Sequence, residues 1–155
     1  MESEGQKNAS AERGNEMSGN LKIMYARAVQ ESKKSQDPST KVGAVIFDGG
    51  YISGLGVNHL AKGSPEEFWN DRSLKYPHVV HAEVSALIRA GKAQGATLVC
   101  SEHPCQSCAI LAVEFGVSRI VCREEPWRDT PEIRESVEGA KAVFARAGVE
   151  VVYVV

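Results

Sequence analysis

His81, Cys105 and Cys108 are side chains that could bind a metal ion together. One imidazole nitrogen and two thiolates are donors that zinc prefers, and three protein ligands leave the fourth tetrahedral position for water, as in catalytic zinc sites. The cysteines are three residues apart just after Pro104, so they share one face of a helix that begins there. The positive end of that helix favours thiolates over thiols. The sequence therefore predicts a catalytic zinc site.

Glu83 lies two residues after His81 and places a carboxylate beside the predicted metal. If it were a fourth ligand, the open position would be lost. As a free carboxylate it can take a proton from water and return it to a substrate. Ala82 between the two residues is small, leaves room for a planar ring and could hydrogen-bond to that ring through its backbone. We therefore expect Glu83 to shuttle protons and Ala82 to contact the substrate.

Two other interpretations of the cysteine pair stay open at this point. A thioredoxin-like redox pair also stands where a helix follows a strand, but it leaves His81 and Glu83 without a role. A structural zinc site needs a fourth ligand, and His103, Cys100 or Cys122 could be nominated. Cysteines in strands are more often buried apolar residues. A structural-zinc or redox module is therefore the non-enzymatic alternative to a catalytic site.

The elements that must position these residues are predicted from apolar periodicity and from the places of glycine and proline. The expected helices are 20–35, 81–90, 105–115 and 131–147, and the expected strands are 42–48, 51–57, 96–101, 118–123 and 150–154. The first two strands form an antiparallel hairpin, and the last three strands, which helices separate, pair in parallel. The sequence therefore predicts an α/β fold, a three-layer α-β-α sandwich with a mixed five-stranded sheet. Residues 58–77 lack a period and are expected to form a functional loop.

Composition and charge narrow the class of protein. The 155 residues suffice for one domain, and the net charge is −2 with no basic stripe, which favours a small-molecule substrate over duplex nucleic acid. Residues 1–19 are polar and are expected to be a disordered tail. No apolar run suggests a membrane span or a signal peptide. We therefore expect a cytoplasmic protein, whose four cysteines bind metal or stay reduced.

Four stretches are similar to the cytidine deaminase superfamily, and most of all to its deoxycytidylate (dCMP) deaminases: Ser35–Asp48, Gly56–Gly63, Lys75–Ile88 and Pro104–Val121. The order His-x-Glu, then Pro-Cys-x-x-Cys, is typical of zinc nucleobase deaminases. The resemblance implies one deaminase domain over residues 20–155, with Zn²⁺ on the three predicted ligands. It also implies a homo-oligomer that converts a cytosine nucleotide, dCMP, to dUMP and ammonia in pyrimidine salvage. Asn58 falls where the family has an asparagine that binds the sugar or base.

The chain departs from the dCMP deaminases beside Asn58, where His59 and Leu60 replace the residues expected there, and at His103, where an aromatic residue is more usual. Phosphate recognition and control by deoxynucleoside triphosphates are therefore not carried over to this chain. Candidate phosphate ligands, each otherwise a surface group, are Ser39, Lys41, Lys62, Arg72 and Lys75. Candidates to stack on a base, each otherwise a packing residue, are Trp69, Trp127 and Tyr153.

The substrate has alternatives that keep the same chemistry. A free base, a nucleoside, a modified pyrimidine or an aminopurine would each present an amino group on an aromatic ring to the same residues. Deamination of adenosine in tRNA is disfavoured by the acidic balance of charge and by the lack of a basic tail. The sequence thus predicts which bond breaks, the bond between a ring carbon and its amino group. It is compatible with more than one kind of ring.

Overall fold

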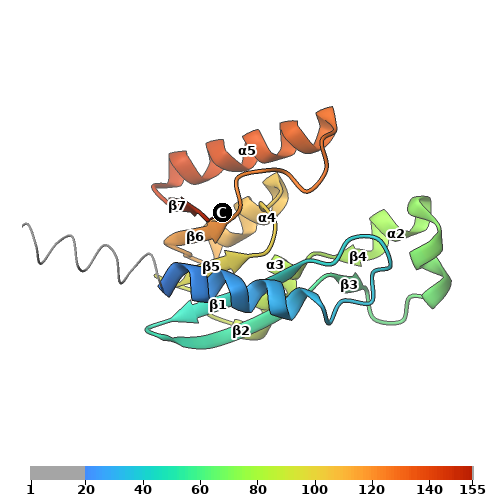
Figure 1. The fold of residues 1–155 in the computed structure, drawn as a ribbon, viewed down its shortest axis with the longest axis horizontal. Coiled ribbons are helices and arrows are strands. Elements are labelled where there is room, and N and C mark those ends of the chain that lie inside the picture. The colour runs from blue at the N-terminus through green and yellow to red at the C-terminus, as the bar shows by residue number, and fades with distance from the viewer. Residues whose placement is uncertain (1–19, 155) are drawn as a thin grey trace, which may run out of the picture.

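The computed structural model describes residues 20–154. The predicted disordered tail, residues 1–19, lies outside the described residues. Five strands form the main sheet in the order β2-β1-β5-β6-β7 (Figure 1). Their bounds are Gly43–Asp48 for β1, Tyr51–Val57 for β2, Thr97–Cys100 for β5, Arg119–Cys122 for β6 and Glu150–Tyr153 for β7. Strand β1 is antiparallel to β2 and β5, whereas β5, β6 and β7 are parallel. The predicted mixed sheet is confirmed.

Helices cover both faces of this sheet. One face carries α3 (Ala82–Ala90), α4 (Gln106–Glu114) and α5 (Pro131–Ala147), and the other carries a helix over residues 20–32. Side chains alternate along each strand, so Ile46, Leu98 and Ile120 pack toward the three helices. Their neighbours in the sequence, such as Val45 and Val99, pack toward the single helix. The predicted three-layer sandwich is therefore confirmed.

Two glycines of β2 let α3 lie unusually close to the sheet. A Cβ atom on Gly56 would be 2.4 Å from the carbonyl oxygen of Ala82, and one on Gly54 would be 2.4 Å from that of Ala86. Side chains at these positions would collide with backbone, which cannot rotate away as a flexible side chain can. The glycines therefore fix how deeply the first turn of α3 sits over the strand, and that turn carries Glu83.

Residues 58–77 are not the irregular loop that the sequence predicted. They hold β3 (His59–Leu60), a 3-10 helix η1 (Glu66–Asn70) and most of α2 (Arg72–His78), after which β4 (Val79–Val80) pairs with β3. These elements project from one end of the main sheet (Figure 1). The two helices among them are shorter than the two or three turns that a helical period needs to become visible, and the two strands are too short to show an alternation. Asp71 caps α2 by accepting a hydrogen bond from the backbone of Ser73.

The first helix also ends earlier than expected, at residue 32, with a turn at Lys33 and Lys34. After this turn, residues 37–42 lie near the starts of α3 and α4, where they line one cleft with His81 and Cys105. Within residues 20–154, no helix is both long enough and apolar enough to cross a bilayer.

Candidate active site

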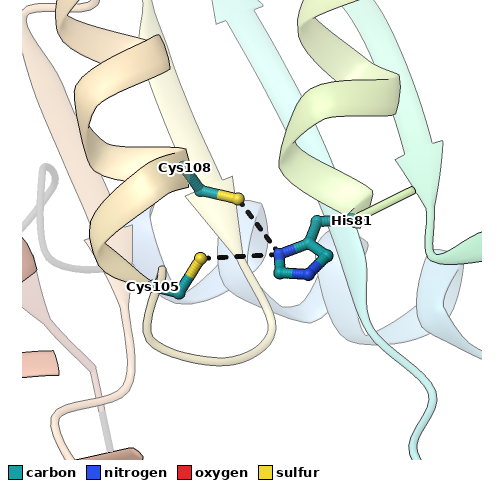
Figure 2. Close-up of side chains that lie close together, drawn as sticks. All are labelled: His81, Cys105 and Cys108. Carbon is teal, nitrogen blue, oxygen red and sulfur yellow. Dashed lines mark hydrogen bonds between the residues drawn. The ribbon is translucent and has the colours of Figure 1, made fainter. Parts of the chain in front are cut away.

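The first turns of α3 and α4 bring the three predicted metal ligands together. His81 is the N-cap of α3 and Cys105 the N-cap of α4, and both have extended backbone. Figure 2 shows His81 reaching from α3 toward the two cysteines of α4. The Nδ1 atom of His81 lies 3.3 Å from the Sγ atom of Cys108 and 3.5 Å from that of Cys105. All three donor atoms lie within 4.8 Å of one another, so one ion could contact all of them.

Among residues 20–154, no fourth His, Cys, Asp or Glu joins this cluster. Cys100 and Cys122, considered above as structural ligands, are fully buried in the apolar core. His103 uses its two ring nitrogens on Pro104 and Tyr153 instead. A set of one imidazole and two sulfurs fits zinc, and a site with three protein ligands is typical of catalysis rather than of structural support.

Hydrogen bonding distributes the protons of the cluster unevenly. The contact with Cys108 holds the pKa of Cys105 far below its usual range, at about 3. The same contact, together with burial, raises the pKa of Cys108. The sulfur of Cys105 in turn raises the pKa of His81 to about 8. Zinc requires a neutral imidazole and deprotonated sulfurs, so this ligand set must release protons when it binds the metal.

Glu83 lies beside the three predicted metal ligands. It is the second residue of α3 and is 4% exposed, and its Oε2 atom accepts a hydrogen bond from Cys108 at 3.6 Å. Burial raises the pKa of this carboxyl. Residues two apart do not share a helix face, but His81 lies outside the helix with extended backbone, so both side chains line one cleft. Ala82, fully buried, lines the same cleft.

The cleft has a volume of about 240 Å³ and extends from the metal cluster to the end of the molecule that carries α2. The cluster and Glu83 lie at one end of it. The other walls come from residues 37–42, from α2, from the segment between β6 and α5 and from the first turns of α5. The site thus joins a potential metal centre, a buried carboxylate and space for a small molecule.

Comparison with known proteins identifies the family of this chain. The family model described as the cytidine and deoxycytidylate deaminase zinc-binding region matches residues 19–124. The chain belongs to this family. An uncharacterised deaminase from the luxG 3′ region of Aliivibrio fischeri is 32% identical over 121 residues, which are 77% of this chain and 82% of that protein. Mouse deoxycytidylate deaminase is 30% identical over 134 residues, which are 80% of this chain and 73% of the mouse protein.

Solved structures agree with the sequence comparison. The dCMP deaminase of the cyanophage S-TIM5 superposes with a TM-score of 0.67 at 25% identity, covering 86% of this chain and 95% of the phage protein. The predicted resemblance to dCMP deaminases is therefore confirmed, and the protein is a hydrolytic deaminase of the cytidine deaminase fold.

One wall of the cleft in this deaminase is built around the buried carboxylate of Asp37. One of its oxygens accepts hydrogen bonds from the backbone N–H groups of Ser39 and Thr40, at 2.9 and 3.2 Å. Lys75 of α2 contacts the other oxygen at 2.8 Å. Burial alone would raise the pKa of Asp37, but the hydrogen bonds from Lys75 and the two N–H groups outweigh it and hold the pKa below its usual value. Asp37 thereby connects α2 to residues 37–40.

Asn58 lies in the same network. Its side-chain amide donates to the second oxygen of Asp37 at 3.1 Å and to the carbonyl of Thr40 at 2.8 Å, and its oxygen accepts from the N–H of Val42 at 2.9 Å. Both hydrogens of this side-chain amide thus form hydrogen bonds with residues 37–40. Asn58 lines the cleft, and substrate binding by this residue stays a prediction beside its visible role in shaping the wall.

The predicted phosphate candidates fall into two groups. Lys41, which donates to the carbonyl of Ser35, and the exposed Lys62 are not among the residues that line the cleft. Ser39, Arg72 and Lys75 do line it. Of these, Lys75 is neutralised by its ion pair, and Ser39 both donates to Asp37 and accepts from Lys75.

The three candidates to stack on a base also differ in their surroundings. Trp127 lines the cleft, between β6 and α5, and is 37% exposed. Trp69 instead lies under the ammonium group of Lys75, with 5.6 Å between the nitrogen and the ring centre. Tyr153 hydrogen-bonds to His103. Only Trp127, of the three, is therefore placed to meet a ligand in the cleft.

Sequence reasoning missed Asp37, Tyr76 and Arg128, which all line the cleft. Asp37 precedes a proline in a polar stretch and looks like an ordinary turn residue. Arg128 follows Trp127 in a segment with no motif. None of the three residues has a spacing to other polar residues that signals a site, because each reaches the cleft only through the tertiary fold.

Proposed function

We propose that the protein is a zinc-dependent deaminase of a cytosine nucleotide, converting dCMP and water to dUMP and ammonia. The observation that carries the proposal is the buried Glu83 carboxylate directly beside a His81, Cys105 and Cys108 cluster at the end of a cleft. The similarity to deoxycytidylate deaminases of mouse and of a cyanophage supports the choice of cytosine nucleotide.

The residues present fit zinc. His81 would bind it through Nδ1, and Cys105 and Cys108 through their sulfurs, because these atoms already converge within 4.8 Å. When bound, zinc supplies Lewis acidity that makes water a nucleophile near neutral pH. Glu83 is the neighbour that remains outside the ligand set, so its carboxylate stays available for protons.

Glu83 supplies the proton transfers that hydrolysis of the amino group needs. Its carboxylate takes one proton from the attacking water and gives it to the ring nitrogen. It then takes the second proton of that water from the new hydroxyl group and gives it to the departing amine. A C–O bond forms at the ring carbon, the C–N bond breaks, and ammonia leaves. Burial favours the protonated form of Glu83, so the carboxyl is suited to hold a proton between these steps. The small side chain of Ala82 leaves space for the planar ring beside it.

Two arginines favour a nucleotide over a free base. Arg72 of α2 and Arg128 of the β6–α5 segment both line the cleft, and neither guanidinium has an ion-pair partner among residues 20–154. Arg128 instead lies over the ring of Trp127, 5.1 Å from its centre. Four acidic residues, Asp37, Glu83, Glu102 and Glu132, line the cleft as well, and of these Asp37 is paired with Lys75. Arginine binds phosphate in a fixed two-pronged geometry, so these side chains are suited to a 5′-phosphate.

The proposal is tested with the zinc-loaded protein and a panel of substrates. Ammonia release is measured for dCMP, deoxycytidine, cytosine, an aminopurine and unmodified tRNA. We expect dCMP to be turned over and to exceed deoxycytidine in kcat/KM. Turnover of an unphosphorylated base without turnover of dCMP would overturn the nucleotide assignment and leave the deaminase chemistry in place.

We also propose that the deaminase self-associates. The outward faces of α3 and α4 expose Ile88 and Ile110, which are 65% and 49% accessible. Apolar side chains on neighbouring helices are suited to an interface between copies. Light scattering on the purified protein tests this, and a mass equal to one chain at micromolar concentration would contradict it. Location in the cytoplasm stays a prediction from the sequence.

A further inference from the structure

His103 is a buried residue of the connection between β5 and α4. It follows β5, precedes Pro104 and is 3% exposed. Its Nδ1 atom lies 2.9 Å from the carbonyl oxygen of Pro104, and its Nε2 atom lies 3.1 Å from the hydroxyl of Tyr153. The rings of His103 and Tyr153 also contact each other, with 5.7 Å between their centres. Both ring nitrogens are thus used within the protein.

The partners of His103 determine which nitrogen carries the hydrogen. A carbonyl oxygen can only accept, so Nδ1 carries the hydrogen that it donates to Pro104. In the neutral ring Nε2 is then an acceptor, and the hydroxyl of Tyr153 donates to it. The hydrogen bonds therefore run in one direction, from the hydroxyl of Tyr153 through the imidazole of His103 to the carbonyl of Pro104.

This chain of hydrogen bonds ends on the peptide next to a proposed zinc ligand. The carbonyl of Pro104 belongs to the peptide whose nitrogen is that of Cys105. The carbonyl of Cys105 in turn accepts from the N–H of Ala109 at 3.0 Å and starts α4. Tyr153 is the last residue of β7, the edge strand that pairs with β6. The ring of His103 thus links the edge of the sheet to the turn that presents Cys105.

We propose that His103 is a positioning residue, which, with Tyr153, holds the Pro104–Cys105 peptide so that the sulfur of Cys105 faces His81. The inference rests on the proposed zinc site. His103 lines the cleft, but both of its nitrogens are committed, so it acts through the peptide of the ligand rather than on a substrate. Partners that orient metal ligands are typically worth about tenfold to a hundredfold in metal affinity or activity.

The test measures how fast the zinc-loaded protein loses its metal to an excess of a chromogenic chelator. H103F keeps a planar ring but removes both hydrogen bonds, and we expect it to release zinc about tenfold to a hundredfold faster than the wild type. Y153F removes only the donor hydroxyl and is expected to accelerate release in the same direction by a smaller factor. Y25F is the matched control, because the hydroxyl of Tyr25 donates at 3.0 Å to the carbonyl of Ser101 in the same β5–α4 connection. It is expected to release zinc at the wild-type rate.

A second readout follows the geometry of the ligands. Cobalt is substituted for zinc, and the intensity and position of its visible absorption report the arrangement of the sulfur donors. We expect H103F and Y153F to shift this spectrum and Y25F to leave it unchanged. If H103F does not fold, Y153F decides the question alone.

The outcomes separate this inference from the proposed function. Wild-type release rates and spectra in both H103F and Y153F would overturn the role of His103 and leave the zinc enzyme intact. A wild-type protein that binds no zinc would overturn both. Equal acceleration by Y25F would also contradict the inference, because the effect would then be a general loosening of the connection.

Discussion

The two ends of the cleft are built in different ways. The end proposed to carry out the chemistry, called the chemical end, consists of His81, Glu83, Cys105 and Cys108, which come from the first turns of two helices that pack on one sheet. The end proposed to bind the rest of the substrate, called the recognition end, is assembled from residues 37–42, from α2 and from the segment around residue 128. The first end needs two short motifs to meet, whereas the second needs three separate segments to converge.

This difference explains what each end can do. Helix starts fix the backbone of the ligands and of Glu83 within one or two residues, so the chemistry is tied to the core. The recognition end is held by the buried pair of Asp37 and Lys75 and by the amide of Asn58, while Arg72 and Arg128 stay available for a ligand. We therefore expect changes at the chemical end to stop turnover of every substrate and changes at the recognition end to alter stability or substrate choice.

The largest expected effect is at Glu83. E83Q removes the group that moves protons and is expected to lower kcat by roughly 10²- to 10⁴-fold for every substrate that is turned over. Zinc content should stay at the wild-type value, because Glu83 is not a proposed ligand. The matched control is E114Q, an exposed carboxylate at the far end of α4, which should keep wild-type turnover. Loss of zinc from E83Q would instead make Glu83 a ligand.

The next effect is on stability and comes from the recognition end. D37N leaves the ammonium group of Lys75 buried without its counter-ion, which typically costs about 3–5 kcal/mol. Chemical denaturation at pH 7 should show this loss in the free energy of unfolding. D129N removes the carboxylate of an exposed pair with Arg134 and should show no measurable change.

The pH dependence of that difference has a definite sign. The pKa of Asp37 is lowered in the folded protein, so its stabilising contribution is present above the unfolded value of about 3.9 and is lost as the pH falls through the lower folded value. The gap in unfolding free energy between the wild type and D37N should therefore be constant near neutral pH and narrow below about pH 5. A gap that widens in acid would show that the carboxylate is not the stabilising form.

Substrate choice should depend on the two arginines. A hydrogen bond to a charged group is worth about 1.5–3 kcal/mol, so R72Q and R128Q should each lower kcat/KM for dCMP by about tenfold to a hundredfold. The kcat/KM for deoxycytidine should not change, since it has no phosphate. K62Q, which removes an exposed charge outside the cleft lining, is the control. Equal losses of kcat/KM for both substrates would show that the two arginines stabilise the wall of the cleft and do not bind the phosphate.

The smallest effect tests how the sheet positions the chemical end. G56A places a Cβ atom 2.4 Å from the carbonyl oxygen of Ala82, so α3 must shift, at a typical cost of about 1–3 kcal/mol. Thermal denaturation should show the lower stability, and kcat should fall because Glu83 moves with the helix. S53A, on the same strand, should change the unfolding free energy by less than about 0.5 kcal/mol. Unchanged stability and kcat in G56A would contradict the claim that this contact positions α3.

The contrast between the two ends also explains what the sequence could predict. The parallel pairing of the last three strands follows from the helices that separate them, and the cysteine pair and His-x-Glu stretch are motifs within a few residues. Asp37, Lys75 and Arg128 are 38 or more residues apart from one another along the chain, and their meeting depends on α2. That helix is a seven-residue element inside residues expected to form a loop. Short elements held by capping and by one buried ion pair leave no periodic pattern in the sequence.

The central claim is that zinc on this chain's cluster enables the deamination of dCMP. Its most direct test removes the metal with a chelator, restores zinc in measured amounts and follows the formation of dUMP and ammonia. The account predicts that turnover is lost with the metal and returns in proportion to added zinc, reaching its limit at one zinc per chain. Full turnover in the metal-free protein, or no release of ammonia from dCMP by the zinc-saturated protein, would contradict it.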